Sequence, residues 1–218
     1  MPYASNAVRA PRALSAAEQK KVLKVSGEHV AGFRDHMILS LALGTGLREL
    51  EISALNVGDV ARGPSEIRSR IQLTTFARKG RVRPGGAAAA VDQRVFVPKI
   101  VRLKLRKFLA WKKREGEAVG KDAALFWAPL GGHDVANGGR ISTRTIRYLF
   151  LQWQKRAGFE RIFTFHELRH TALTNLYKAT KDVLLVQQQA RHASVTTTQM
   201  YSHVSEEDIR RAVDDMPG

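Results

Sequence analysis

The sequence predicts a mainly α-helical domain with one small antiparallel β-sheet. Apolar residues recur at helical spacing over most of the 218 residues, whereas alternating, β-branched stretches occur only between Ser65 and Pro98. A hydrophobic content of 44% is sufficient for a core, and the chain contains no internal repeats. One domain therefore accounts for most of the chain.

The first helix is predicted from its capping residues. Residues 1–13 are small, basic and interrupted by prolines, which is typical of a disordered lead-in or a linker stub. Ser15 and Glu18 then have the spacing of a capping box. We expect an amphipathic helix from this point to about Val25.

Two further helices are expected before residue 56. A nearly continuous apolar pattern over residues 33–43 indicates a buried helix that stops at Gly44 and Gly46. A short helix should follow, and its apolar side is expected to contain four residues: Leu47, Leu50, Ile52 and Leu55.

The pattern changes to that of a sheet in the middle of the chain. Residues 67–75 and 93–98 alternate and are rich in β-branched side chains, so each is predicted to contain a strand. The segment Ala-Arg-Lys-Gly at 77–80 is placed in a turn or a neighbouring strand. Residues 84–93 are of low complexity and are expected to form an excursion from the sheet.

The second half is predicted to be helical. A long basic helix should run from Lys99 to about Glu115, held by Ile100, Leu103, Leu105, Leu109 and Trp111. A glycine-rich loop over 128–140 precedes a helix from about Ser142 to Ala157. Four more helices are expected to start near Phe165, Asp182, Thr196 and Ser205.

Composition restricts the possible partners. The formal net charge is +16, which indicates a polyanionic partner. A membrane surface is disfavoured because no apolar run approaches the roughly 20 residues of a spanning helix; nucleic acid is therefore favoured. The absence of cysteine excludes disulfides, thiolate nucleophiles and cysteine-based zinc sites. The N-terminus also lacks a signal-peptide core, so a cytoplasmic, nucleoid-associated location is expected.

Seven side chains have the chemistry that phosphoryl transfer to a protein hydroxyl requires. The transition state carries excess negative charge, the nucleophile loses a proton and the leaving oxygen gains one. An arginine guanidinium can pair with two phosphate oxygens. Imidazoles and lysine can exchange protons, and a tyrosine hydroxyl can attack the phosphorus. The candidate residues are Arg48, Lys79, His166, Arg169, His170, His192 and Tyr201. Arg48 also lies where a helix start would direct N–H groups at an anion.

A zinc site is the main competing interpretation of the segment from His166 to His170. Its sequence, His-Glu-Leu-Arg-His, fits the His-Glu-x-x-His pattern of zinc peptidases, with both imidazoles on one helical face. The positive charge of Arg169 would oppose a cation there, and no third ligand is well placed. The phosphate interpretation, unlike the zinc interpretation, also uses Arg48, Lys79 and Tyr201.

With these motifs identified, the chain resembles the catalytic domain of the tyrosine recombinases, the phage integrase family. The resemblance covers residues 14–204. Its specific parts are Thr-Gly-Leu-Arg-Glu-Leu-Glu at 45–51, the His-x-x-Arg-His box at 166–170, and the tyrosine segment at 192–204. The sequence around Lys79 matches the β-hairpin lysine of the family more weakly.

The resemblance implies the integrase catalytic-domain fold and a mechanism without metal, ATP or another cofactor. Tyr201 would attack the scissile phosphate of double-stranded DNA and form a 3′-phosphotyrosyl intermediate. Arg48, Arg169 and His192 would hold the phosphate, and His166 or His170 would assist proton transfer at Tyr201. Lys79 would protonate the departing 5′-oxygen, and Glu51 would orient the cluster from behind.

The chain departs from the family pattern in three places. Arg191 stands where the family usually has glycine, which is expected to alter the turn before His192. The hairpin is extended by residues 84–93, which affects the assignment of Lys79. The N-terminal core-binding domain of most members is missing, so the chain is a fragment, a naturally short member or an accessory protein.

Two rival functions and the mode of assembly stay open at this stage. A type IB topoisomerase would use the same chemistry on one duplex, and a DNA-binding regulator would keep the fold without the reaction. A recombinase is expected to act as a tetramer on DNA, with possible accessory DNA-bending proteins.

Residues 205–218 form an acidic segment with apolar residues on one helical face. This helix either folds back on its own core or docks on a neighbouring subunit.

Overall fold

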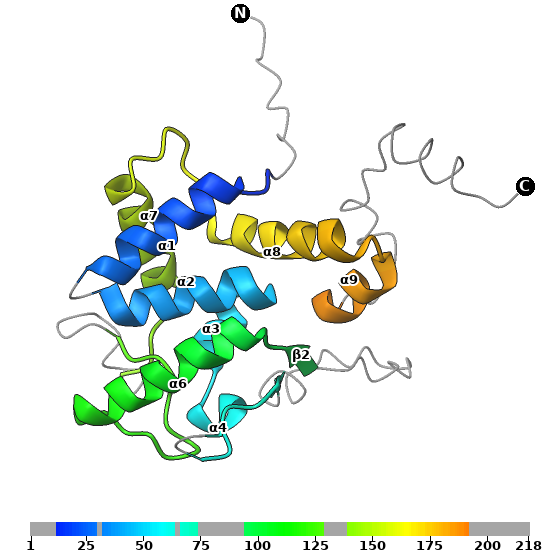
Figure 1. The fold of residues 1–218 in the computed structure, drawn as a ribbon. Helices are drawn as coiled ribbons and strands as arrows, with labels where there is room; N and C mark the ends of the chain where they lie inside the picture. The colour runs from blue at the N-terminus through cyan, green and yellow to red at the C-terminus, as the bar shows by residue number, and fades with distance from the viewer. Residues whose placement is uncertain (1–11, 30–31, 64–65, 74–93, 129–138, 192–218) are drawn as a thin grey trace, which may run out of the picture.

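The structure is a computed structural model that describes residues 12–29, 32–63, 66–73, 94–128 and 139–191. It is mainly helical with one two-stranded antiparallel sheet, as predicted (Figure 1). None of the described helices is both long and apolar enough to cross a membrane. The predicted helices near Thr196 and Ser205 lie outside the described residues.

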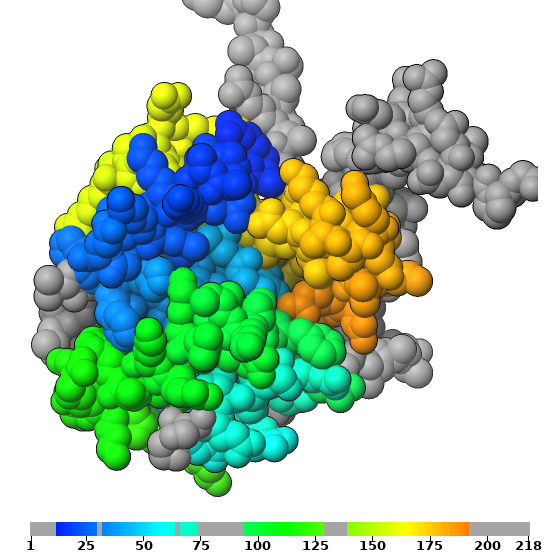
Figure 2. All heavy atoms as spheres, in the orientation of Figure 1, coloured from blue at the N-terminus to red at the C-terminus, as the bar shows by residue number. Residues whose placement is uncertain are grey.

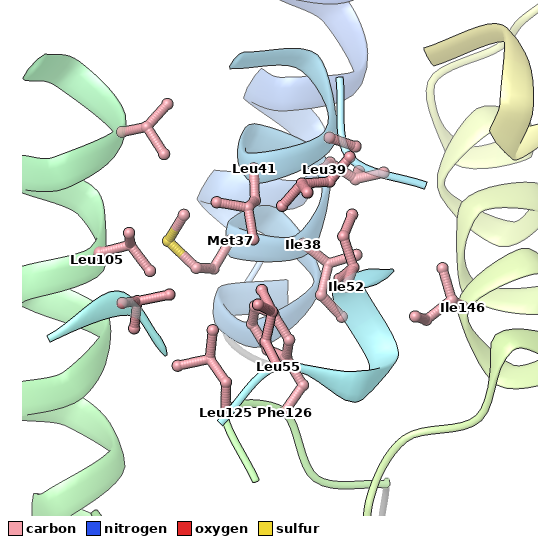
Figure 3. Packing of buried hydrophobic residues seen from close by; sticks show 14 of the residues in the cluster. Met37, Ile38, Leu39, Leu41, Ile52, Leu55, Leu105, Leu125, Phe126 and Ile146 are labelled. Atoms are coloured by element: carbon pink, nitrogen blue, oxygen red, sulfur yellow. The ribbon is translucent and has the colours of Figure 1, made fainter. Parts of the chain in front are cut away.

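Helix α2, Phe33–Thr45, is the centre of the fold. It packs against α1 (Ala16–Glu28), α6 (Lys99–Arg114), α7 (Thr143–Arg156) and α8 (Phe165–Thr180). Figure 3 shows its side chains Met37 and Leu41 between α6 on one side and α3 (Glu49–Ala54) on the other. In the space-filling view, α1, α2 and α6 occupy neighbouring parts of one face (Figure 2).

The capping box of α1 forms as predicted. The Glu18 carboxylate accepts the Ser15 N–H at 2.7 Å, and the Ser15 hydroxyl accepts the Glu18 N–H at 3.2 Å. The helix continues to Glu28, beyond the predicted end at Val25. Ser26 is buried in this last turn and its hydroxyl lies 3.1 Å from Nδ1 of His36, so a contact with the next helix, α2, accompanies the extra turn.

The prediction that Gly44 stops α2 was wrong. Gly44 lies inside the helix, and a Cβ there would come within 2.5 Å of Val101 on α6. The glycine therefore permits close approach of two helices rather than ending one. Gly46 does end α2, in the left-handed conformation with φ 71°, and its N–H donates to the Ala42 carbonyl.

The predicted apolar faces were partly wrong. Helix α3, Glu49–Ala54, buries Ile52, but Leu50 is 56% exposed because two residues apart on a helix face opposite sides. In α6, Ile100 and Leu103 are exposed, whereas the residues that anchor it in the core are Val101, Leu105, Phe108 and Leu109. A four-residue helix, α4 at Val57–Val60, was not predicted.

The sheet pairs β1, Arg70–Gln72, with β2, Arg94–Phe96. Both strands are shorter than the alternating segments that predicted them. Ile71 and Val95 are paired and buried on the inner face, and their neighbours point outward. Residues 74–93, between the strands, lie outside the described residues.

The last described helices are α8 and α9, Val183–Ala190. The predicted start of α9 is confirmed, because the Asp182 carboxylate accepts the N–H groups of Leu184 and Leu185. Phe165, Leu168 and Ala172 of α8 are buried, so this face of the helix packs against the core.

Candidate active site

The turn between α2 and α3 presents Arg48 to solvent over a buried carboxylate. The Glu51 Oε2 atom accepts the backbone N–H of Arg48 at 2.7 Å, and its Oε1 atom accepts from Arg48 Nη1 at 3.0 Å. The Arg48 side chain is 44% exposed and that of Glu51 only 7%. The carboxylate thus holds a guanidinium at the surface. The same carboxylate also accepts the backbone N–H of Arg48, which was expected to face an anion.

Arg169 joins this turn to the end of α9. Its Nη1 atom donates to the Gly46 carbonyl and its Nη2 atom to the Ala190 carbonyl, each at 2.6 Å. The residue is only 2% exposed. Arg169 therefore connects three segments that are far apart in sequence.

Arg191 makes a contact that sequence reasoning missed. It ends α9 in the left-handed conformation with φ 56°, where glycine is the usual residue. Its Nη2 atom donates to Glu51 Oε1 at 2.5 Å, and both side chains are buried. The same carboxylate oxygen therefore accepts hydrogen bonds from both Arg191 and Arg48. An arginine at a position expected to hold glycine was the available signal, but the identity of its partner depends on the fold.

The electrostatics of Glu51 follow from these contacts. Burial raises the pKa of its carboxyl, but the charge of Arg191, the Arg48 N–H and the charge of Arg48 outweigh burial. The net result is a lowered pKa. Glu51 is thus a carboxylate at neutral pH and neutralises part of the positive charge between two arginines.

Gln189 attaches the sheet to the same region. Its side-chain amide donates to the Thr45 and Phe96 carbonyls, each at 3.0 Å, and its oxygen accepts the Phe96 N–H at 3.1 Å. The amide therefore bonds the backbone of β2 at Phe96 as a neighbouring strand would. This contact, also not predicted, ties β2 to α9 and to the end of α2.

The two histidines of α8 differ in exposure. His166 is exposed and His170 is half-buried. Partial burial lowers the pKa of His166, and the charges of Arg169 and Arg48 lower it further. The imidazole of His166 is therefore neutral at pH 7 and can accept a proton.

Glu167 does not have the role that the zinc interpretation requires. Its carboxylate accepts the Thr164 N–H at 2.6 Å and an N–H of Arg161 at 3.0 Å, and the residue is buried. It caps the start of α8 instead of activating a water beside His166 and His170. Within the described residues, no three histidine or acidic side chains form a group that could hold a metal ion.

The structure brings together five of the eight residues singled out from the sequence, at the junction of the α2–α3 turn and α8. These are Arg48, Glu51, His166, Arg169 and His170. Lys79, His192 and Tyr201 lie outside the described residues.

Comparison with known proteins gives a consistent result. Residues 93–208, more than half of the chain, match the model of the phage integrase family. The chain is 28% identical over 204 residues to tyrosine recombinase XerC of Haemophilus ducreyi. That alignment covers 94% of this chain but only 59% of the relative.

Two solved structures share the fold. The crystal structure of XerA recombinase matches with a TM-score of 0.69 and 25% identity, covering all of this chain and 68% of the other. The Tn1549 transposon integrase, solved with transposon right end DNA, matches with a TM-score of 0.71 and 18% identity. The latter match covers 98% of this chain and 68% of that one.

Proposed function

The chain belongs to the phage integrase family, and we propose that it is a site-specific recombinase that cleaves and rejoins double-stranded DNA through a 3′-phosphotyrosyl intermediate. The Tyr201 oxygen attacks the scissile phosphorus as its proton leaves, and the bond from phosphorus to the 5′-oxygen breaks. That oxygen takes a proton from Lys79. In the reverse step, a 5′-hydroxyl of the partner duplex attacks and releases Tyr201.

The observation that carries this proposal is the junction made by Arg169. Its two bonds to the Gly46 and Ala190 carbonyls hold the turn bearing Arg48 next to the end of α9. The residue after Arg191 is His192, the third group proposed to bind the phosphate. Arg48, Arg169 and His192 would thus approach one phosphate from three segments and stabilise its charge.

The histidines of α8 supply the proton acceptor in this scheme. His166 lies beside the two arginines, and partial burial together with their charges lowers the pKa of its imidazole, which is neutral at pH 7. A neutral imidazole can take the tyrosine proton as the phosphorus–oxygen bond forms. His170, one turn further along α8, is the second candidate for this role.

Double-stranded DNA is the proposed partner. The net charge of +16 suits a polyanion, and the Tn1549 integrase, with the same fold, was solved with DNA. Recombination joins two duplexes, each cut on both strands, so we propose a tetramer on DNA. Accessory DNA-bending proteins would assist its assembly.

Covalent capture in the presence of a chelator tests the reaction. The protein is incubated with a library of nicked duplexes in excess EDTA, and the products are separated in detergent. A slowly migrating protein–DNA band is expected without metal or ATP, because arginines supply the charge stabilisation. Attachment that is lost with EDTA and restored by zinc would contradict the proposal. Relaxation of supercoiled DNA without strand exchange between duplexes would favour a topoisomerase.

Deletion of residues 206–218 tests the assembly. The segment carries five acidic and two basic side chains, with Ile209, Ala212, Val213 and Met216 at helical spacing. We propose that it docks on a neighbouring subunit and so couples cleavage to assembly. The truncated chain should bind DNA normally but form few tetramers, as measured by native gel and light scattering. Wild-type tetramer levels would show that the segment is no intersubunit tether.

A further inference from the structure

A second positively charged site lies on the outer face of the sheet, apart from the candidate active site around Arg48. Five arginines line a cleft of about 460 Å³ between the segment after α4, the sheet and the start of α6. We call it the arginine cleft; its arginines are Arg62, Arg68, Arg70, Arg94 and Arg102. Gln72 and Glu66 also line it.

The pairing of the strands explains why these side chains meet. Ile71 and Val95 are buried on the inner face, so Arg70 and Arg94 point to the outer face. Arg94 is directly opposite Gln72, which places Arg70 and Arg94 in diagonal positions on the same face. Diagonal side chains of this length can reach one common ligand.

The charge of the cleft is poorly balanced by its own lining. Among the described residues that line it, five guanidinium groups share the cleft with one carboxylate, that of Glu66, which pairs with Arg62 at 3.1 Å. Both members of that pair are more than 60% exposed, so the pair contributes little to stability. Arginine does not lose its proton to relieve repulsion. An anion in the cleft would reduce the repulsion.

Two of the arginines are held in place before any ligand arrives, and a third carries a buried donor that lacks a partner among the described residues. Arg68 Nε donates to the Gly58 carbonyl at 3.0 Å, and the Arg70 guanidinium lies over the Phe96 ring at 4.4 Å. The Nε atom of Arg102 is buried and has no hydrogen-bond partner within the described part of the chain. A buried donor without a partner costs about 1–3 kcal/mol, which an acceptor in the cleft would offset.

We propose that the arginine cleft binds phosphate groups of the DNA backbone other than the scissile phosphate. Guanidinium forks match phosphate oxygens, and a polar cleft with this charge suits a diester better than an apolar ligand. The cleft shares β2 with the candidate active site, because Gln189 bonds the Phe96 backbone and the end of α2. DNA held here would also restrain the sheet beside the cleaving site. The identity of the ligand rests on the function proposed above.

The test removes charge from the cleft and measures the salt dependence of DNA binding. The cleft variant, Arg70→Gln with Arg94→Gln, changes two exposed strand residues. The control variant, Arg106→Gln with Lys107→Gln, removes two exposed charges of α6 outside the lining. The slope of log K against log salt should become shallower by about 0.9 for each phosphate that the protein no longer neutralises, and only in the cleft variant. Equal slopes in the two variants would overturn the proposal.

Two further measurements separate the alternatives. Arg102→Gln should reduce the slope without lowering the melting temperature, because the Nε donor that it removes has no partner within the described part of the chain. A slope equal to wild type would contradict a role for Arg102 in the cleft.

Inorganic phosphate is titrated against each chain; stabilisation of wild type alone, with unchanged DNA slopes, would assign the cleft to free phosphate. Covalent capture by each variant is measured in parallel, so absence of capture by wild type identifies a failure of the proposed function instead.

Discussion

Replacing Glu51 with alanine should destabilise the folded chain by about 3–5 kcal/mol. The substitution leaves the guanidinium of Arg191 buried without its carboxylate, and removing one partner of a buried ion pair costs about this much. It also releases Arg48, which shares the same Glu51 oxygen. Urea unfolding at pH 7 measures the loss. Glu28→Ala, which breaks an exposed pair with Lys24, serves as the control and should cost less than about 0.5 kcal/mol.

The pairing with Arg191 can be isolated by a double-mutant cycle. Arg191→Gly removes the charge and suits the left-handed φ of 56° at that position. The double variant should be destabilised less than the sum of the single variants, by about 1–3 kcal/mol, since it leaves no buried charge unpaired. Additive losses would show that the two side chains do not interact.

Acid should remove the contribution of Glu51 to stability. Its pKa is lowered in the folded chain, so its contribution is fully present above the unfolded pKa of about 4.3. The contribution is lost as the pH falls from there through the folded pKa. Glu51→Gln has no carboxylate to protonate, so stability curves of the two chains should converge in this acidic range. If the difference in unfolding free energy between wild type and Glu51→Gln stayed constant down to about pH 2, the result would contradict the ion pair.

Covalent attachment should fall together with this pairing. Glu51 joins the turn that carries Arg48 to the end of α9, where the chain enters His192. A displacement of about 1 Å among reacting groups can reduce a rate by about a hundredfold. At a temperature where both chains are folded, Glu51→Ala should therefore cleave at least about tenfold more slowly than wild type.

Local signals in the sequence predicted most of the fold. Ser15 with Glu18 and Asp182 identified helix starts because these side chains cap backbone groups within their own helices. Gly44 was misread because its role depends on Val101, more than fifty residues further along the chain. A glycine that ends a helix and one that admits a neighbouring helix look the same in the sequence.

In the candidate site, too, local signals identified residues, whereas contacts between distant residues were not predicted. The residue types at Arg48, His166 and Arg169 indicated phosphate chemistry because that chemistry needs arginine forks and imidazoles. Two contacts that hold the site together, Arg191 with Glu51 and Gln189 with Phe96, join residues about a hundred or more positions apart. No local pattern encodes them, so they appeared only in the folded chain.

The covalent intermediate itself is the most direct test of the proposed function. Tyr201→Phe removes one oxygen atom, the proposed nucleophile, and leaves the charge of the chain unchanged. DNA affinity should therefore stay within about twofold of wild type, because affinity depends largely on counterion release at phosphates. The variant is incubated with a duplex nicked beside the scissile phosphate, so that the short cleaved strand diffuses away and wild type is trapped.

Wild type should give a detergent-resistant protein–DNA band, and proteolysis with mass spectrometry should find the nucleotide on the peptide that contains Tyr201. Tyr177→Phe, a change of the same size on α8, should still give the band. The Tyr201→Phe chain should give none while binding DNA normally. A comparable band from Tyr201→Phe, or a nucleotide on another residue, would contradict a phosphotyrosyl mechanism at Tyr201.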